Sequence, residues 1–251
     1  MKIIAHRGAS GEFPENSLLA FEQAIVQKTD GIELDVHFHD ESQTFIIIHD
    51  AYLDKTTDGK GHFNDLSLGQ LTALSLSGGQ KLVTLEQALI QIAGRTLLNI
   101  ELKTATDDQR QIELQLSALK KLLSTACLKY GFTDDKFILS SFNHHVVYTS
   151  KKIMPHINTA ALIAHCPLNN ADFADAIHCD FINPDINILN KAFVDDAKEK
   201  GYQVFVYTVD RIKEIELCQK LKVDGVFTNF PAKTRAIING GIRENNEKID
   251  N

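Results

Sequence analysis

The stretch GIELDVH, residues 31–37, alternates aliphatic and polar side chains with a period of two. That period is typical of a β-strand, in which successive side chains point to opposite faces. The aliphatic residues would share one face, and the carboxylates of Glu33 and Asp35 would share the other. Two carboxylates side by side on a buried face repel each other and shift their pKa values unless a positive charge lies between them. The pattern therefore indicates either a cation site or the solvated outer face of an edge strand.

Short apolar runs of this kind recur along the chain and alternate with helical patterns. Strand-like runs occupy residues 2–5, 31–37, 44–48, 97–103, 137–140, 159–163, 181–182, 203–208 and 225–227. Helices are predicted over residues 18–25, 112–123, 171–177, 189–200, 211–221 and 231–238. Strand then helix, repeated, indicates a parallel sheet covered by helices, either as a closed barrel or as a doubly wound open sheet. About eight repeats in 251 residues favour a TIM (β/α)8 barrel.

One region interrupts this rhythm. Residues 52–95 are rich in Gly, Thr, Ser and Asp and contain one clear helical pattern, at 85–92. We therefore expect a small insertion after the 44–48 strand, which in a barrel would cap the mouth and restrict what enters. Residues 1–239 would form a single barrel domain, followed by a polar C-terminal tail at 240–251.

Composition restricts the class of protein. The formal net charge is −7, which argues against nucleic-acid partners and against docking on anionic membranes. The N-terminus lacks a signal-peptide pattern, and no apolar stretch approaches the roughly 20 residues of a membrane span. The protein is therefore expected to be cytoplasmic, without stable membrane insertion. Its four cysteines form no C-x-x-C pair, which indicates unpaired thiols in a reducing compartment.

A second polar face occurs in the 97–103 strand, where Glu101 and Lys103 lie together opposite aliphatic neighbours. In a parallel barrel, inward positions near the carboxyl ends of the strands face the active site. Glu33, Asp35 and Glu101 could then surround one divalent cation, Mg²⁺ or Ca²⁺, because both ions prefer oxygen ligands. Lys103 could bind a phosphate oxygen. An ordinary ion pair between Glu101 and Lys103 is the alternative.

Two histidines follow strand-like runs. His6-Arg7-Gly8 comes after the first run, and His49-Asp50 ends the run at 44–48. A lone histidine is more often structural, but two at equivalent barrel positions predict an acid–base pair that works near neutral pH. Arg7 is a good phosphate ligand because its guanidinium is planar and permanently charged.

Other histidine interpretations carry less weight. His37 and His39 continue the face of the two strand carboxylates. They could support the acids, but we expect them to be solvent-exposed residues at the strand end. A His-Asp pair also occurs on a helix in metal phosphohydrolases, whereas His49-Asp50 follows a β-like run, so that assignment is set aside.

Short motifs lie in a fixed order from the first strand to the last. They are His6-Arg7-Gly8, Pro14-Glu15-Asn16-Ser17, Glu33-Leu34-Asp35-Val36, His49-Asp50, Thr56-Thr57-Asp58-Gly59, Glu101-Leu102-Lys103, Ser141-Phe142 and Asp224-Gly225-Val226-Phe227-Thr228-Asn229. In this order they resemble the glycerophosphodiester phosphodiesterases over essentially the whole chain. The chain departs from the usual family residues at Ser17, Lys55, Tyr207, Asn229 and the 41–43 turn.

The resemblance implies a TIM barrel with an insertion after the second barrel strand. It implies a Mg²⁺ or Ca²⁺ site at Glu33, Asp35 and Glu101, an acid–base pair of His6 and His49, phosphate contacts from Arg7 and Lys103, and a head-group pocket lined by Phe142 and Tyr207. The implied reaction hydrolyses a glycerophosphodiester to sn-glycerol 3-phosphate and an alcohol such as choline or ethanolamine. It implies attack by the glycerol 2-hydroxyl, a cyclic phosphate, and then water.

Two alternatives stay open. A lysophospholipase D-like phosphodiesterase on the same barrel would need an apolar ramp beside the mouth, and residues 52–95 show no strongly amphipathic helix. A barrel that only binds phosphorylated ligands would have lost an acid or a histidine, and none is missing. Neither the oligomeric state nor the head-group preference follows from the residues.

Overall fold

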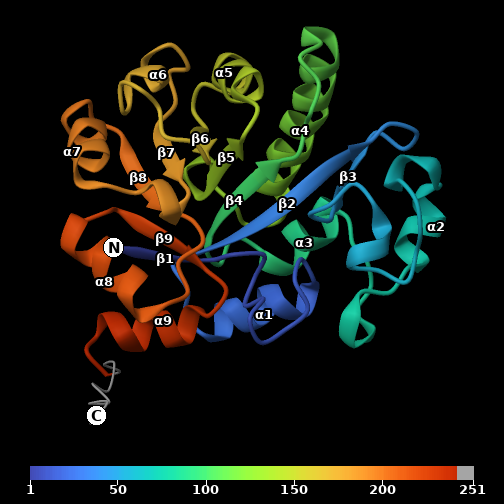
Figure 1. Cartoon of the computed structure of the whole chain (residues 1–251). Helices are drawn as coiled ribbons and strands as arrows, with labels where there is room; N and C mark the ends of the chain where they lie inside the picture. The colour runs from blue at the N-terminus through green and yellow to red at the C-terminus, as the bar shows by residue number, and fades with distance from the viewer. Residues whose placement is uncertain (242–251) are drawn as a thin grey trace.

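Eight parallel strands form a closed ring (Figure 1). The structure is a computed structural model that describes residues 1–241. The ring strands are β1 (Lys2–Ala5), β2 (Gly31–His39), β4 (Leu97–Leu102), β5 (Phe137–Ser141), β6 (Asn158–Ile163), β7 (Phe181–Pro184), β8 (Gln203–Val206) and β9 (Gly225–Thr228). Their order is β1-β9-β8-β7-β6-β5-β4-β2, and pairing of β1 with β2 closes the ring. The predicted TIM barrel is therefore confirmed.

Helices surround the ring on its outer side. They are α1 (Leu18–Val26), α3 (Leu85–Ile92), α4 (Gln109–Lys129), α5 (His144–Ile153), α6 (Asp172–Asp175), α7 (Lys191–Glu199), α8 (Ile212–Leu221) and α9 (Pro231–Ile238). The apolar residues spaced along α4 are buried, as their periodicity predicts. The sequence patterns did not predict α5, and α6 is shorter than the expected 171–177.

The barrel interior changes from apolar to polar along its axis. Its apolar layer consists of Ile4, Ile138, Ala160, Phe181, Phe205 and Phe227. Side chains alternate along a strand, so the next inward position lies two residues further toward the carboxyl end. Those positions hold His6 after Ile4, Ser140 after Ile138 and Asn183 after Phe181. The polar groups therefore gather at the end of the barrel where active sites of this fold lie.

The ninth strand, β3 (Thr44–Ile47), lies outside the ring and pairs antiparallel with the end of β2. An irregular segment follows it and contains the 3-10 turns η1 (Leu53–Lys55), η2 (Phe63–Asp65) and η3 (Ser77–Gly79) and the helix α2 (Leu68–Ala73). Its apolar core consists of Ile46, Ile48, Leu53, Phe63, Leu71 and Leu82. The segment is thus a small packed unit beside the mouth, with one more helix than expected.

The prediction that His37 and His39 are solvent-exposed was wrong. The two side chains are 9% and 0% exposed, because β2 extends beyond the ring and the insertion covers it. His37 Nε2 donates to the carbonyl of His49 at 3.0 Å, and a ring nitrogen of His39 lies 2.8 Å from the carbonyl of Leu66. Both rings therefore attach the β3 segment and the insertion to β2.

Two expectations concern the rest of the chain. Within residues 1–241, no helix is long and apolar enough to cross a membrane. Most of the predicted tail at 240–251 lies outside the described residues.

Candidate active site

Three carboxylates converge at the mouth of the barrel. Glu33 and Asp35 extend from β2 on the same face, and Glu101 lies on β4 directly beside Asp35 in the strand register. One oxygen from each carboxylate lies within 4.8 Å of the others, and the residues are only 3%, 0% and 7% exposed. The sequence alternation thus placed the three acids together correctly, and the cluster could hold a metal ion.

The cluster carries more negative charge than its neighbours balance. Lys103 Nζ lies 3.0 Å from Asp35 Oδ1 and also contacts Glu101, while Arg7 Nε lies 3.2 Å from Asp35 Oδ2. Burial raises the pKa of Asp35, but Lys103 and Arg7 outweigh it and lower that pKa to about 2. Burial, with Asp35 next in importance, raises the pKa of Glu101 to about 7. Burial and the neighbouring acids likewise raise the pKa of Glu33 well above its ordinary value.

These pKa directions test whether a divalent cation suits the cluster. Glu33 and Glu101 hold their protons more tightly than free carboxyls do, because burial disfavours their charged forms and the neighbouring acids repel them. Glu33 Oε1 is buried and has no hydrogen-bond partner among residues 1–241. An oxygen-rich donor set with excess negative charge fits Mg²⁺ or Ca²⁺, which are held by carboxylate oxygens.

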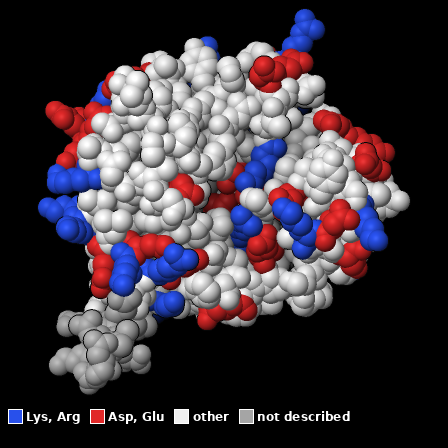
Figure 2. Space-filling model, in the orientation of Figure 1, with Lys and Arg blue, Asp and Glu red and all other residues white. Residues whose placement is uncertain are grey.

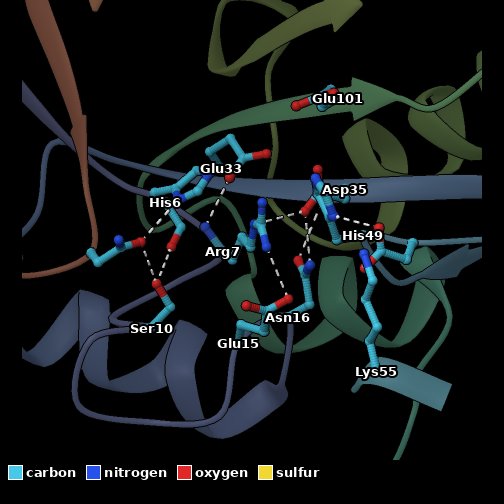
Figure 3. A network of polar contacts seen from close by, with 12 residues as sticks. His6, Arg7, Ser10, Glu15, Asn16, Glu33, Asp35, His49, Lys55 and Glu101 are labelled. Atoms are coloured by element: carbon cyan, nitrogen blue, oxygen red, sulfur yellow. Dashed lines mark hydrogen bonds and ion pairs between the residues drawn. The ribbon is translucent and has the colours of Figure 1, made fainter. Parts of the chain in front are cut away.

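His6 is held by a chain of hydrogen bonds from the barrel (Figure 3). Its Nδ1 lies 2.8 Å from Asn229 Oδ1, and Asn229 Nδ2 donates to Asp210 Oδ2 at 2.6 Å. The Asp210 carboxylate also accepts from the Asn229 backbone N–H at 2.8 Å. Because a carboxylate only accepts, the amide oxygen of Asn229 must face His6, and His6 Nδ1 must carry the proton. His6 Nε2 is then free to accept a proton.

The surroundings of His6 also favour its neutral form. Burial, followed by the charge of Arg7, lowers the pKa of His6 to about 4. Ser10 Oγ lies 2.8 Å from Asn229 Oδ1 and 2.6 Å from the His6 carbonyl, which fixes the start of this loop. No role was predicted for Ser10 or Asp210, because neither residue stands in a sequence motif that would have indicated one.

The tight loop after β1 explains the His6-Arg7-Gly8 motif. Arg7 has a positive φ of 57°, and its backbone N–H donates to Glu33 at 2.8 Å. Gly8 has φ 79°, and a Cβ there would lie 2.7 Å from Ala20, so only glycine fits. The loop therefore presents both a backbone donor and the guanidinium of Arg7 to the acidic cluster.

Two residues of the motif Pro14-Glu15-Asn16-Ser17 contact Asp35 and Arg7. Asn16 Nδ2 donates to Asp35 Oδ2 at 2.9 Å, and Glu15 pairs with Arg7 at 3.0 Å. Ser17 Oγ accepts from Ala20 N–H at 3.1 Å and begins α1, so the hydroxyl has a helix-capping role.

His49 comes from a different part of the fold than His6. It follows β3, which runs antiparallel to β2, and so it does not lie at a ring position equivalent to that of His6. The hairpin brings the end of β3 back beside Asp35, since the Ile48 N–H donates to the Asp35 carbonyl at 3.2 Å. In Figure 3, His6 and His49 lie on opposite sides of Glu33 and Asp35.

The support of His49 comes from its own segment and from β2. His49 Nδ1 lies 3.3 Å from Asp50 Oδ1, and Lys55 Nζ lies 3.1 Å from Asp50 Oδ2. Burial lowers the pKa of His49, and the charge of Asp35 opposes that change. Its side chain is 32% exposed, so the ring is partly open to solvent.

Aromatic residues border the acidic cluster. Phe142 and Tyr207 meet edge to face with ring centroids 5.8 Å apart. Both line a small cavity of about 20 Å³, together with His6, Glu33, Asn99, Glu101, Ser140, Leu162 and Phe227. Phe142 also lines an outer groove of about 310 Å³ beside Lys103. Figure 2 shows acidic atoms at the bottom of a hollow on this face, with basic side chains beside them.

The closed barrel and the charged cluster at the carboxyl ends of its strands define a TIM-barrel enzyme with its active site at the usual end. A profile of the glycerophosphoryl diester phosphodiesterase family matches residues 6–233. The chain therefore belongs to this family.

Two similar proteins agree with the assignment. The glycerophosphodiester phosphodiesterase of Caldanaerobacter subterraneus subsp. tengcongensis is 31% identical over 237 residues, which cover 91% of this chain and 94% of that protein. A phosphodiesterase from Oleispira antarctica, solved in complex with the product sn-glycerol-3-phosphate, aligns with a TM-score of 0.86 at 26% identity, covering 95% of this chain and 97% of that one.

Proposed function

We propose that the protein hydrolyses glycerophosphodiesters to sn-glycerol 3-phosphate and an alcohol. The reaction would use one Mg²⁺ or Ca²⁺ ion held by Glu33, Asp35 and Glu101, with His6 and His49 as the acid–base pair. The observation that carries this proposal is the convergence of three buried carboxylates between two histidines. Membership of the family supports the substrate class.

The substrate phosphodiester is an anion, and the site offers it two cationic side chains. Arg7 and Lys103 both contact Asp35 at the edge of the cluster. A bound divalent cation would draw charge from a phosphate oxygen and make a nearby hydroxyl more acidic. Arg7 and Lys103 would then be free to turn toward the remaining phosphate oxygens, which Arg binds through two parallel N–H groups.

The histidines would move the protons. Attack by the glycerol 2-hydroxyl on phosphorus releases the alcohol and forms a cyclic phosphate, which water then opens. In the first step one imidazole takes the hydroxyl proton and the other gives a proton to the leaving oxygen, and in the second step they exchange roles. The Nε2 atom of His6, free in the tautomer that Asn229 imposes, can accept such a proton.

Phe142 and Tyr207 would contact the organic part of the substrate. Their rings meet beside the cluster, and Lys103 Nζ lies 5.9 Å from the Phe142 ring centroid. Neither lysophospholipase D activity nor ligand binding without turnover is favoured by a specific contact at this site.

The proposal predicts a metal-dependent activity. Purified protein is incubated with glycerophosphocholine or glycerophosphoethanolamine, and a coupled enzyme reports glycerol 3-phosphate. We expect EDTA to reduce turnover by at least about 10²-fold, because the cation supplies several kcal/mol of charge stabilisation, and added Mg²⁺ or Ca²⁺ to restore it. Full turnover in EDTA would reject the metal mechanism, and no turnover with any cation would favour a binding protein.

A matched pair of variants localises the metal dependence. Glu101→Gln should weaken cation binding and turnover without loss of folding stability, because it relieves repulsion among the buried acids. Glu216→Gln makes the same change at an exposed position of α8 and should change neither property. Equal cation affinity in the two variants, measured by calorimetry, would exclude Glu101 as a ligand.

A further inference from the structure

A groove runs from the acidic cluster to the insertion. The outer groove of about 310 Å³ begins at Glu101 and Lys103. A second hollow of about 240 Å³, the insertion groove, adjoins it and reaches residues 62–64 of the insertion. The two hollows share His37, Lys103, Thr104 and Ala105. The insertion groove is further lined by Asp40, Asn64, Gln111 and Gln115. A ligand held at the cluster can therefore extend through the outer groove into the insertion groove.

One wall of the insertion groove presents hydrogen-bond donors. Gln111 and Gln115 lie one turn apart on α4, so their side chains share one face of the helix. Gln115 Oε1 accepts from the hydroxyl of Thr104 at 2.7 Å, which leaves the amide NH2 group of Gln115 to donate elsewhere. Neither that NH2 group nor the side chain of Gln111 makes a hydrogen bond within residues 1–241. This wall therefore offers amide groups to a ligand in the groove.

A second wall presents an acceptor. Asn64 Nδ2 donates to Asp40 Oδ2 at 2.9 Å, and the Asp40 backbone N–H donates to Asn64 Oδ1 at 3.2 Å. This two-way contact fixes Asp40, which directly follows β2, against the insertion. Its Oδ1 accepts no hydrogen bond from the part of the chain that the structure describes. A carboxylate oxygen is thus available in the same groove as the amides of α4.

This combination of groups suits an alcohol that carries several hydroxyls. A hydroxyl both donates and accepts, so such an alcohol can bond to the amide of Gln115 and to the carboxylate of Asp40 at once. A quaternary ammonium group can do neither and is typically bound on the open face of an aromatic ring. The phenyl rings that line the groove, Phe38 and Phe63, are only 6% and 4% exposed. Asp40 could attract a cation, but the two amides would add nothing to its binding.

We propose that the insertion groove binds the alcohol that the reaction releases, and that this alcohol is a polyol such as inositol instead of choline. This inference rests on the proposed function. With the phosphate at the acidic cluster, the alcohol extends past Lys103 along the outer groove. Gln115 then donates to one of its hydroxyls, and Asp40 accepts from another. The insertion groove has several times the volume of a water molecule and so has room for a head group of many atoms.

Two substrates that differ in the head group test the proposal. Initial rates with glycerophosphoinositol and glycerophosphocholine are measured with Mg²⁺ or Ca²⁺, and a coupled enzyme reports glycerol 3-phosphate. Wild-type protein should favour the inositol ester roughly 10- to 100-fold in kcat/KM, the range expected for two hydrogen bonds. Gln115→Leu should lower kcat/KM for the inositol ester about 3- to 10-fold, and that for the choline ester should change by less than about twofold.

Three further variants separate the contact from folding and from charge. Gln219→Leu makes the same change at an exposed position of α8 and should leave both rates as in the wild-type protein. If Gln115→Leu unfolds at a lower temperature, Gln111→Leu takes its place, because it removes a side chain that makes no hydrogen bond within residues 1–241. Asp40→Asn removes the charge but keeps an acceptor oxygen, and it should change each rate by less than about threefold.

Equal kcat/KM values for the two esters in the wild-type protein would overturn the inference and leave the proposed function intact, as would an unchanged ratio in the glutamine variant. A fall of the choline rate alone in Asp40→Asn would also overturn it and would assign the groove to cationic head groups. Hydrolysis of neither ester would reject the proposed function, and calorimetry with the intact esters would then decide the inference. Tighter binding of the inositol ester, lost in the glutamine variant, would keep the groove as a polyol site, and equal binding of the two esters would reject it.

Discussion

His6 and His49 face the same acidic cluster, but the molecule supports them in different ways. His6 follows a ring strand, and its Nδ1 bonds to Asn229, which is fixed by Asp210. His49 belongs to a hairpin outside the ring, and its Nδ1 contacts Asp50, which in turn pairs with the exposed Lys55. One side of the site is therefore built by the barrel itself, and the other depends on the hairpin and the insertion.

Because the supports of the two histidines differ, the two sides of the site are expected to respond differently to substitution. The His6 side uses buried or half-buried groups whose geometry is fixed by the closed ring of strands. The His49 side includes a lysine whose side chain is 72% exposed, and exposed ion pairs contribute little. The barrel side should thus be rigid and sensitive to substitution of its supports, whereas the hairpin side should tolerate such substitution.

The largest loss of turnover should come from removing the imidazole ring of His6 or His49. His6→Ala and His49→Ala should each reduce kcat by about 10²–10⁴-fold, because each removes one partner of the acid–base pair. Circular dichroism and cation affinity should remain as in the wild-type protein, since neither ring belongs to the acidic cluster. A variant with near-normal turnover would remove that histidine from the reaction and would break the comparison between the two sides.

Strand periodicity explains how much of the site could be predicted. Glu33, Asp35 and Glu101 were assigned to one cluster from alternation within two strands, because the facing of a side chain in a strand is a local property. The ring then brought the strands together. The catalytic and ligand roles of these residues and of the two histidines stay predictions.

Pairings between distant segments were not predictable in the same way. The antiparallel return of β3 and the burial of His37 and His39 depend on how the insertion packs on β2, and no local pattern encodes that packing. Asp210 and Gln115 are single polar residues outside any motif, and their surroundings are formed by other segments of the chain. The missing information in each case is tertiary contact, which period and spacing do not contain.

The two histidines should also differ in how they link stability to pH. In EDTA, the pKa of His6 is 6.5 in the unfolded chain and about 4 in the folded protein. The unfolded state therefore binds more protons between these values, so the stability that the neutral ring contributes is complete above pH 6.5 and is lost as the pH falls toward 4. The loss should reach at most about 3 kcal/mol.

Substitution of the histidines separates the pH-dependent stability due to His6 from that due to Glu33 and Glu101. The pKa values of Glu33 and Glu101 are raised, so those groups act in the opposite direction, but they are common to all variants. His6→Gln should therefore lose less stability than the wild-type protein between pH 6.5 and 4 in urea titrations, and His49→Gln should differ less from it. Parallel curves for His6→Gln and the wild-type protein would show that His6 titrates normally.

The smallest effects should distinguish the two sets of supports most sharply. Asn229→Leu removes the acceptor that fixes His6 Nδ1 and the side-chain donor to Asp210 Oδ2, while the backbone N–H of residue 229 still donates to Asp210. We expect kcat to fall roughly 10- to 100-fold, as is typical when a buried hydrogen-bond partner is lost. Lys55→Met removes only an exposed ion pair with Asp50 and should change kcat by less than about fivefold.

These two variants are measured at saturating substrate and cation, so that kcat reports the oriented ring and not ligand binding. In Lys55→Met, Asp50 keeps its contact with His49, so the imidazole of His49 retains its hydrogen-bond acceptor. In Asn229→Leu, His6 can adopt the other tautomer, with Nε2 protonated. An equal loss of kcat in both variants would mean that the exposed Lys55 positions His49 as firmly as the barrel positions His6. The two sides of the site would then differ in where they lie in the fold but not in how firmly they hold their histidines.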